Sequence, residues 1–207
     1  MSDLWDARRL TARWLSTGVC STEYLLQGTR IRCSSPMDQA LMAQEPIHPE
    51  TRIGHVHLKV ADLERAIAFY VQVLGFELTQ RMGDSAAFLS AGGYHHHLGL
   101  NTWESRGGAA PPAGSTGLYH AAILYPTRTE LARVLRRLLD HNVSLDGAAD
   151  HGVSEALYLR DPDGNGLELY WDRPEGEWPR DGAGALAMFT RPLDLAGLLA
   201  ELSASSA

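Results

Sequence analysis

The chain has 207 residues, of which 44% are hydrophobic and 21% charged, with a formal net charge of −7 at pH 7. This balance is typical of a globular protein and excludes a wholly disordered chain. The acidic charge argues against a nucleic-acid partner, because phosphates call for a basic surface. No apolar run is long enough for a membrane span, so we expect no membrane partner. Two cysteines exclude a disulfide framework and a four-cysteine zinc site, whereas nine histidines are the first functional signal.

Residues 1–36 differ from the rest of the chain, because they hold both cysteines and more basic than acidic residues. They lack the continuous apolar core of a secretory signal, so we expect a cytoplasmic protein. We interpret this stretch as a poorly ordered extension, followed by a lead-in over residues 37–52. A functional arm is the alternative interpretation.

Residues 53–105 predict one βαβββ module. An alternating strand over 53–60 precedes Asp62, which predicts a helix N-terminus. The helix has one apolar face and ends at Gly75, which favours a helix C-terminus. Strands are then expected over 76–81, 86–90 and 95–102, with a Gly92-Gly93 turn before the last. The apolar helix face consists of Ala66, Phe69, Tyr70, Val73 and Leu74.

Residues 118–172 repeat this pattern after a Gly- and Pro-rich linker over 106–117. A strand over 118–125 precedes Thr127 and Glu130, which form a capping box. The helix that follows repeats the apolar face with an offset of 65 residues, the same offset that separates His55 from His120. Strands are expected over 143–145, 156–160 and 167–171, and the tail over 173–207 predicts one short helix near 193–202. The fold class is therefore α+β, built from two tandem βαβββ modules.

Three side chains in this pattern are suited to hold a metal. His55 and His120 stand at matching positions of the two first strands, and Glu168 lies on the last strand of the second module. A lone histidine on a strand is usually a hydrogen-bonded core residue, but matched histidines with a carboxylate favour a metal site. Two imidazoles and one carboxylate form a facial triad that suits Fe(II) or Mn(II), with Zn or Ni as further candidates.

Three segments of the chain resemble the vicinal oxygen chelate superfamily, and within it the one-domain extradiol dioxygenases of the catechol 2,3-dioxygenase type. They are Gly54-His55-Val56, the helix from Asp62 to Phe76 and the stretch from Asp161 to Tyr170. The resemblance implies that the modules form a curved mixed sheet around a metal cleft. It also implies His55, His120 and Glu168 as metal ligands.

The same resemblance implies three catalytic residues. Tyr158 stands ten residues before Glu168, where these enzymes carry a tyrosine that would hydrogen-bond bound oxygen or catecholate. His96 has the setting of the histidine that would protonate the leaving oxygen. His151 is the candidate for a further histidine before the tyrosine, although its spacing of seven residues is short for the pattern.

His97 has a competing assignment. Matching the Gly92-Gly93 turn to the turn before Glu168 places His97 opposite Glu168, which would make it a fourth metal ligand as in glyoxalase-type sites. Resemblance favours His96 as acid and repeat geometry favours His97 as ligand, and the sequence does not decide between them. Trp103, Trp171 and Trp178 are candidates for the wall of an aromatic pocket, with core or interface packing as the alternative.

The expected activity is cleavage of a catechol-like aromatic diol by dioxygen, with Fe(II) as the first choice of metal and Mn(II) as the second. A homodimer is expected. The alternatives are a glyoxalase-like lyase or isomerase, and a non-catalytic protein of the same superfamily that binds a small molecule such as an antibiotic.

Overall fold

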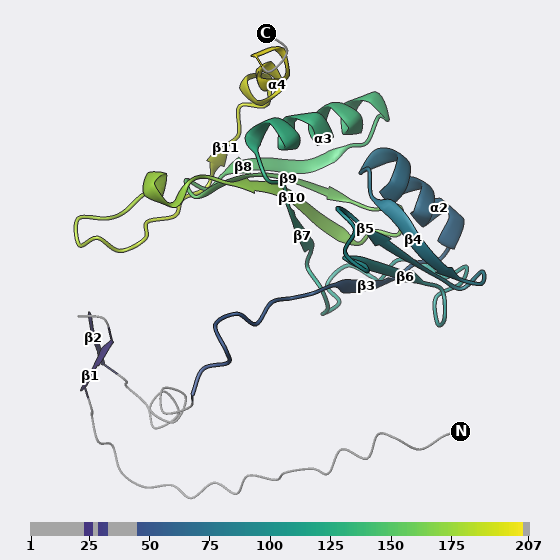
Figure 1. Ribbon diagram of the computed structural model, residues 1–207, viewed down its shortest axis with the longest axis horizontal. Helices are drawn as coiled ribbons and strands as arrows, with labels where there is room; N and C mark the ends of the chain where they lie inside the picture. Colours follow the sequence, from purple (N-terminus) through teal and green to yellow (C-terminus); the bar gives the residue numbers. More distant parts are fainter. Residues whose placement is uncertain (1–22, 27–28, 33–44, 205–207) are drawn as a thin grey trace, which may run out of the picture. The chain divides into compact units, whose positions relative to one another are not determined.

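The computed structural model describes residues 23–26, 29–32 and 45–204 and divides the chain into two units, Met1–Arg52 and Ile53–Ala207. In the first unit, β1 (Glu23–Leu26) and β2 (Thr29–Arg32) form an antiparallel hairpin that the sequence did not predict. The remainder of the expected extension over 1–36 lies outside the described residues. The site therefore concerns the second unit, whose elements are labelled in Figure 1.

The first module forms a four-stranded sheet in the order β3-β6-β5-β4, with its helical segment between β3 and β4. Asp62 caps the helix as predicted, since its side chain accepts the Arg65 N–H at 3.0 Å. Gly75 ends the helical segment in the left-handed region, with φ of 90°. The elements are β3 (Val56–Lys59), α2 (Leu63–Ala68), the π-helix η1 (Phe69–Val73), β4 (Glu77–Met82), β5 (Ala86–Ser90) and β6 (Leu98–Asn101).

The second module forms a five-stranded sheet in the order β11-β8-β9-β10-β7. Thr127 caps its helix by accepting the Glu130 N–H at 3.2 Å, as predicted. The elements are β7 (Ala121–Leu124), α3 (Arg128–Asp140), β8 (Leu145–Asp150), β9 (Ser154–Arg160), β10 (Gly166–Asp172), the 3-10 helix η2 (Glu175–Glu177), β11 (Arg191–Pro192) and α4 (Leu195–Ala204).

Two expectations about the second module need correction. The strand predicted over 143–145 is wrong in its bounds, because β8 runs from Leu145 to Asp150. The Asp-Gly-Ala-Ala-Asp run has low strand propensity, and its pairing with β9 makes it a strand. The second correction is β11, which adds a strand to the sheet from the tail.

The modules have matching topology, because each first strand pairs in parallel with the last strand of its own module. Val56 lies opposite Leu98, and Ala121 lies opposite Leu167. In the part of the chain that the structure describes, however, no ladder joins β3 to β7. The expected single curved sheet is thus two mixed sheets, each ending on its first strand.

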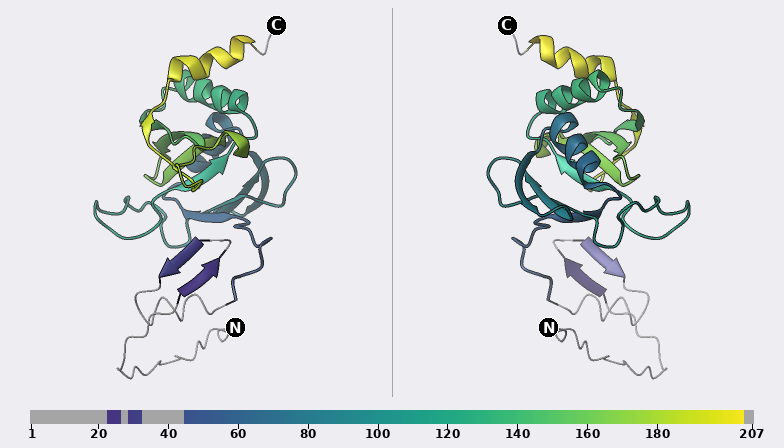
Figure 2. Two further views of the ribbon diagram at one scale, coloured as in Figure 1. Left: turned by 90° about the vertical axis from the view of Figure 1, so that its left-hand side faces the viewer. Right: turned by 90° about the vertical axis from the view of Figure 1, so that its right-hand side faces the viewer.

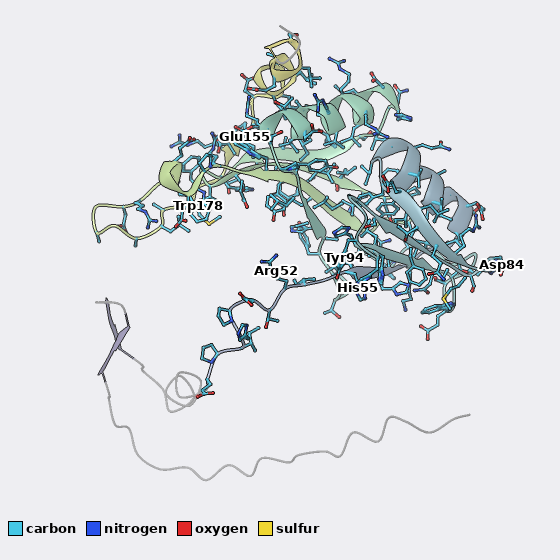
Figure 3. The ribbon with its side chains drawn as sticks, viewed as in Figure 1. Arg52, His55, Asp84, Tyr94, Glu155 and Trp178 are labelled. Carbon is cyan, nitrogen blue, oxygen red and sulfur yellow. The ribbon has the colours of Figure 1, made fainter. Side chains whose placement is uncertain are left out.

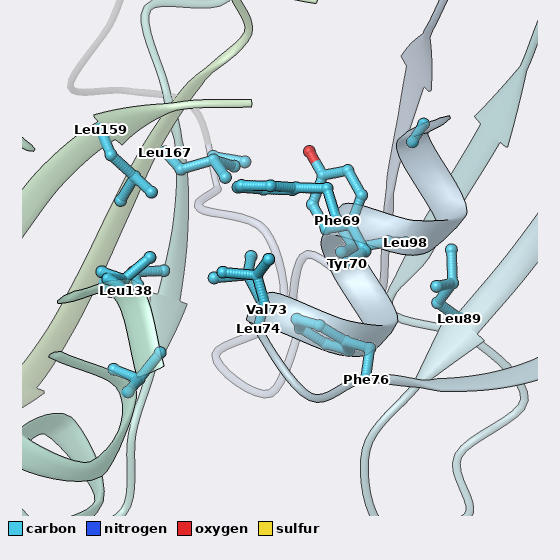
Figure 4. Packing of buried hydrophobic residues seen from close by; sticks show 14 of the residues in the cluster. Phe69, Tyr70, Val73, Leu74, Phe76, Leu89, Leu98, Leu138, Leu159 and Leu167 are labelled. Atoms are coloured by element: carbon cyan, nitrogen blue, oxygen red, sulfur yellow. The ribbon is translucent and has the colours of Figure 1, made fainter. Parts of the chain in front are cut away.

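The core lies on the helix side of both sheets (Figure 2), and α2, η1 and α3 cover it there. Phe69 and Val73 point from η1 toward Leu138 of α3 and Leu167 of β10 (Figure 4). Burying one such side chain contributes about 1.5–3 kcal/mol. Because this core spans both modules, it fixes their relative placement, and the opposite face of each sheet is partly exposed.

Polar contacts also join the modules. The buried Tyr70 hydroxyl donates to Asp161 at 3.0 Å, and burial together with the charge of Asp161 raises the pKa of Tyr70. Asp163 accepts the Ala61 N–H at 2.8 Å and binds Arg65 at 2.7 Å. The turn before β10 is therefore anchored to the start of α2. Over the described residues, no helix has the length and apolar character needed to span a membrane.

Candidate metal centre and catalytic residues

Two predicted ligands meet at the exposed face of the second sheet. His120 immediately precedes β7, and Glu168 lies in β10 opposite Ala122. Since side chains two positions apart on a strand share a face, His120 and Glu168 lie on the same side. The Nε2 atom of His120 is 2.9 Å from Oε2 of Glu168, and both side chains are partly exposed.

Tyr158 and His151 extend this pair into a hydrogen-bonded chain. Tyr158 lies opposite Glu168 in the β9–β10 pairing, and its hydroxyl donates to Oε1 of Glu168 at 2.9 Å. On the other side, the Nε2 atom of His151 is 2.8 Å from the Tyr158 hydroxyl. Burial, followed by the bond to Glu168, raises the pKa of Tyr158, so the phenol stays protonated and can donate.

A cavity of about 230 Å³ opens beside this chain, and His120, Gly147 and Tyr158 are among the residues that line it. Its size is suited to a small molecule. A larger cavity of about 520 Å³ lies at the start of α2, where Arg65 and Arg106 line it with none of the predicted site residues. The smaller cavity is therefore the one relevant to the predicted chemistry.

His120 and Glu168 are of residue types that bind metal ions, and their 2.9 Å contact is that of an imidazole–carboxylate pair. Two ligands about 2.1 Å from one cation and at right angles to each other would also lie about 3 Å apart. Tyr158 would hold the remaining carboxylate oxygen, as residues beyond the ligands commonly do. Within the described residues, however, no group of three or more His, Cys, Asp or Glu side chains is arranged to hold a metal.

His55, the third expected ligand, lies with the first module. It precedes β3, and its ring lies 4.4 Å from that of His96 (Figure 3 shows His55 beside Tyr94). No hydrogen bond, ion pair or ring contact between described residues joins it to His120 or Glu168. Of the three expected ligands, His120 and Glu168 therefore lie together, and His55 lies apart from them. His55 and His120 both stand just outside the pairing of their strands, so the ladders do not fix their rings.

The exposed face of the first sheet carries a cluster of rings instead. The ring of His57 lies 5.2 Å from Trp103 and 6.1 Å from Phe88, and Phe88 lies 5.0 Å from His96. Partial burial and the neighbouring His55 lower the pKa of His57. Desolvation, with His55 as the next contribution, lowers the pKa of His96. Both rings are therefore favoured in the neutral form.

The register argument for His97 is wrong. Because Val56–Leu98 corresponds to Ala121–Leu167, the counterpart of Glu168 is Gly99. The Nδ1 atom of His97 accepts the Ala91 N–H at 3.3 Å and lies 3.1 Å from Ser90 Oγ. In this structure the His97 ring is therefore held through Nδ1 by the turn between β5 and β6.

Sequence reasoning missed two features of the site. Gly99 lies against the His57 ring, since a Cβ there would be 2.9 Å from two ring carbons. The small residue after Leu98 was the available signal for this packing. The second feature is the contact of His151 with Phe189 and Thr190 from the tail, for which the sequence offered no signal.

Two relatives with known names are similar to this chain in sequence. A catechol-2,3-dioxygenase of Bacillus subtilis (strain 168) is 46% identical over 155 residues, which cover 75% of this chain and 53% of that protein. Biphenyl-2,3-diol 1,2-dioxygenase 3 of Rhodococcus globerulus is 33% identical over 124 residues, 58% of this chain and 63% of that protein. The chain thus spans between half and two thirds of the length of these two relatives.

Solved structures show the same fold. A glyoxalase/dioxygenase from Nostoc punctiforme has a TM-score of 0.52 at 17% identity, covering 64% of this chain and 99% of its own. A domain from Frankia sp. EAN1pec, described as glyoxylase/bleomycin resistance protein/dioxygenase, has a TM-score of 0.50 at 25% identity and covers 59% and 98%. The family profile matches residues 52–169, which include both modules and the His120–Glu168 pair. The chain therefore belongs to the Glyoxalase/Bleomycin resistance protein/Dioxygenase superfamily.

Proposed function

We propose that the chain is a metal-dependent extradiol dioxygenase that cleaves the ring of a catechol-like aromatic diol. The observation that carries the proposal is a chain of contacts: His120 Nε2 lies 2.9 Å from Glu168, Tyr158 donates to Glu168, and His151 faces the Tyr158 hydroxyl. It joins two metal donors to a phenol and an imidazole that can move a proton. The dioxygenase names of the similar Bacillus and Rhodococcus proteins support the reaction class.

In this proposal His120 and Glu168 hold the cation, and His55 completes the set after a turn of its exposed ring. The carboxylate and imidazole donors suit Fe(II) first and Mn(II) second. A bound divalent cation supplies a lowered pKa for a coordinated catechol hydroxyl and brings the diol and dioxygen together. The hydrogen bond from Tyr158 orients the Glu168 carboxylate in the absence of metal.

The remaining roles belong to groups that bind substrate or carry protons. When substrate binds, Tyr158 turns its single hydroxyl hydrogen from Glu168 toward a substrate oxygen, and His151 orients the phenol from behind. His96 receives a proton and returns it to the oxygen that leaves. Phe88 and Trp103 offer aromatic faces for a substrate ring on the same side of the first sheet as His57. The enzyme acts as a cytoplasmic homodimer in this proposal.

An oxygen electrode tests the reaction. Protein purified without oxygen and loaded with Fe(II) or Mn(II) is expected to consume dioxygen when catechol is added, as a yellow ring-opened product appears. Glu168→Gln serves as the control, because it replaces a charged metal donor with a neutral amide. A panel of substituted catechols that consumes no oxygen with either metal would contradict the proposal and favour a glyoxalase-like or binding function.

A further inference from the structure

The tail of the chain reaches the outer side of His151. The Nδ1 atom of this ring lies 3.2 Å from Thr190 Oγ1 and 3.3 Å from the carbonyl oxygen of Phe189. Its Nε2 atom faces the Tyr158 hydroxyl at 2.8 Å. His151 therefore connects a segment outside the βαβββ module with the tyrosine beside Glu168.

Backbone pairing brings the tail to this position. In the β11–β8 ladder Arg191 lies opposite Asp150, and the Phe189 N–H donates to the His151 carbonyl at 3.3 Å. Gly152 has a φ of 78°, and a Cβ there would lie 2.6 Å from the Phe189 ring. Close packing on the Gly152 backbone thus holds the Phe189–Thr190 step next to the imidazole.

Helix α4 anchors the other end of the tail. Leu198 is fully buried, and α4 packs on α3, as both views of Figure 2 show. Arg128 of α3 binds the buried Glu155 at 2.8 Å and Glu201 of α4 at 2.5 Å. The stretch that holds Thr190 is therefore fixed between the β11 ladder and this ion-pair cluster.

A count of hydrogens shows what the tail controls. The Phe189 carbonyl can only accept, so it favours the form of His151 that carries a hydrogen on Nδ1. In the neutral ring Nε2 then accepts, and the single hydroxyl hydrogen of Tyr158 is shared between His151 and Glu168. If the His151 ring turns away, or carries its hydrogen on Nε2, the Tyr158 hydroxyl hydrogen has Glu168 as its only acceptor of the two.

We propose that Thr190 is a positioning residue: with the Phe189 carbonyl, its hydroxyl holds the His151 ring in the orientation and tautomer that face Tyr158. The proposal rests on the proposed function, because Tyr158 is its reactive partner. It assigns the C-terminal segment a part in the site, in addition to its packing on α3.

The test compares Thr190→Val, which removes the hydroxyl at nearly constant shape, with Thr190→Ser, which keeps it. We expect kcat with catechol to fall about two- to tenfold in Thr190→Val, the effect of losing one hydrogen bond, with KM unchanged. Thr190→Ser should retain the wild-type kcat. Thr129→Val makes the same change on α3 and should also leave kcat unchanged. Thr190→Ala provides a second hydroxyl deletion if the valine variant folds poorly.

A second measurement does not depend on turnover. Nitrogen NMR of the metal-free, ¹⁵N-histidine-labelled chain reports the tautomer of each ring, and His151→Gln identifies the His151 signals. We expect the hydrogen on Nδ1 in wild type and Thr190→Ser. We expect a mixture in Thr190→Val, because the ring then keeps only its 3.3 Å contact with the Phe189 carbonyl and is held less firmly. This readout stands even if no catechol is cleaved, so failure of the proposed function is recognised separately.

Three results would overturn the proposal. They are unchanged His151 signals in both hydroxyl deletions, an equal fall of kcat in Thr190→Ser and Thr190→Val, and a fall of kcat in Thr190→Val with unchanged His151 signals. The last result would mean that the hydroxyl acts elsewhere.

Discussion

The two modules share a topology but differ at one corresponding position of their sheets. Where the second module has Glu168, the first has Gly99, and the His57 ring occupies the space above that glycine. The counterpart of His57 in the second module is Ala122, which lies opposite Glu168. Both modules therefore keep the capped helix and the order of their core strands, whereas only the second module has a carboxylate at this position.

The largest expected effect is the loss of metal binding when the histidine beside Glu168 in the second module is removed. His120→Ala removes one of two donors 2.9 Å apart, so we expect metal affinity to fall more than about 100-fold, beyond the loss typical for residues that support a ligand. Metal analysis after anaerobic loading measures it. His57→Gln changes an imidazole of the first module outside the proposed ligand set and should keep the wild-type content. Wild-type metal content in His120→Ala would count against the site.

The next largest effect concerns the first module, to which we assign proton transfer and not the two metal donors that lie together. His96→Ala should keep its metal and lose turnover by about 10²–10⁴-fold, the contribution of a general acid or base. Paired metal analysis and oxygen uptake on one preparation check this. If the variant turned over at the normal rate, His96 would have no catalytic role and the first module would contribute only aromatic packing.

The smallest effect tests why the first module has a glycine where the second has Glu168. Gly99→Ala should lower the free energy of unfolding by about 1–3 kcal/mol, because its Cβ would meet ring carbons of His57 at 2.9 Å. Urea denaturation measures the change. Gly147→Ala is the matched control, since a Cβ there meets nothing within 4 Å. Adding His57→Ala to Gly99→Ala should recover part of the loss, and strict additivity of the two changes would contradict the proposed contact.

Local signals in the sequence were enough for the elements that carry the site. Asp62 and Thr127 cap helices where predicted, and the 65-residue offset of their positions reappears between Val56 of β3 and Ala121 of β7. The His120–Glu168 contact followed from that repeat. The bounds of β8 could not be predicted in this way, because its small and polar residues form a strand only through pairing with β9.

The features that the sequence did not predict depend on contacts between segments that are distant in the chain. Residues 191–192 are too short a strand to leave a periodic pattern, so the tail's approach to His151 had no local signal. The ring position of His55 is set by contacts with His96 and not by the β3 ladder. The predicted position of His97 opposite Glu168 was wrong, because the strand pairing aligns Leu98 with Leu167 and the two turns do not correspond.

The outer edges of the two sheets also differ in how they end. All six residues of β4 are exposed, but the strand carries Glu77 and Arg81 and shifts register between Leu78 and Gln80. The outer strand of the other sheet, β11, is two residues long and includes Pro192, which has no N–H to offer. Charges, a bulge and a proline are the means by which proteins keep sheet edges from recruiting strands of other molecules. The edges at β4 and β11 therefore both carry features that disfavour pairing with a strand of another molecule.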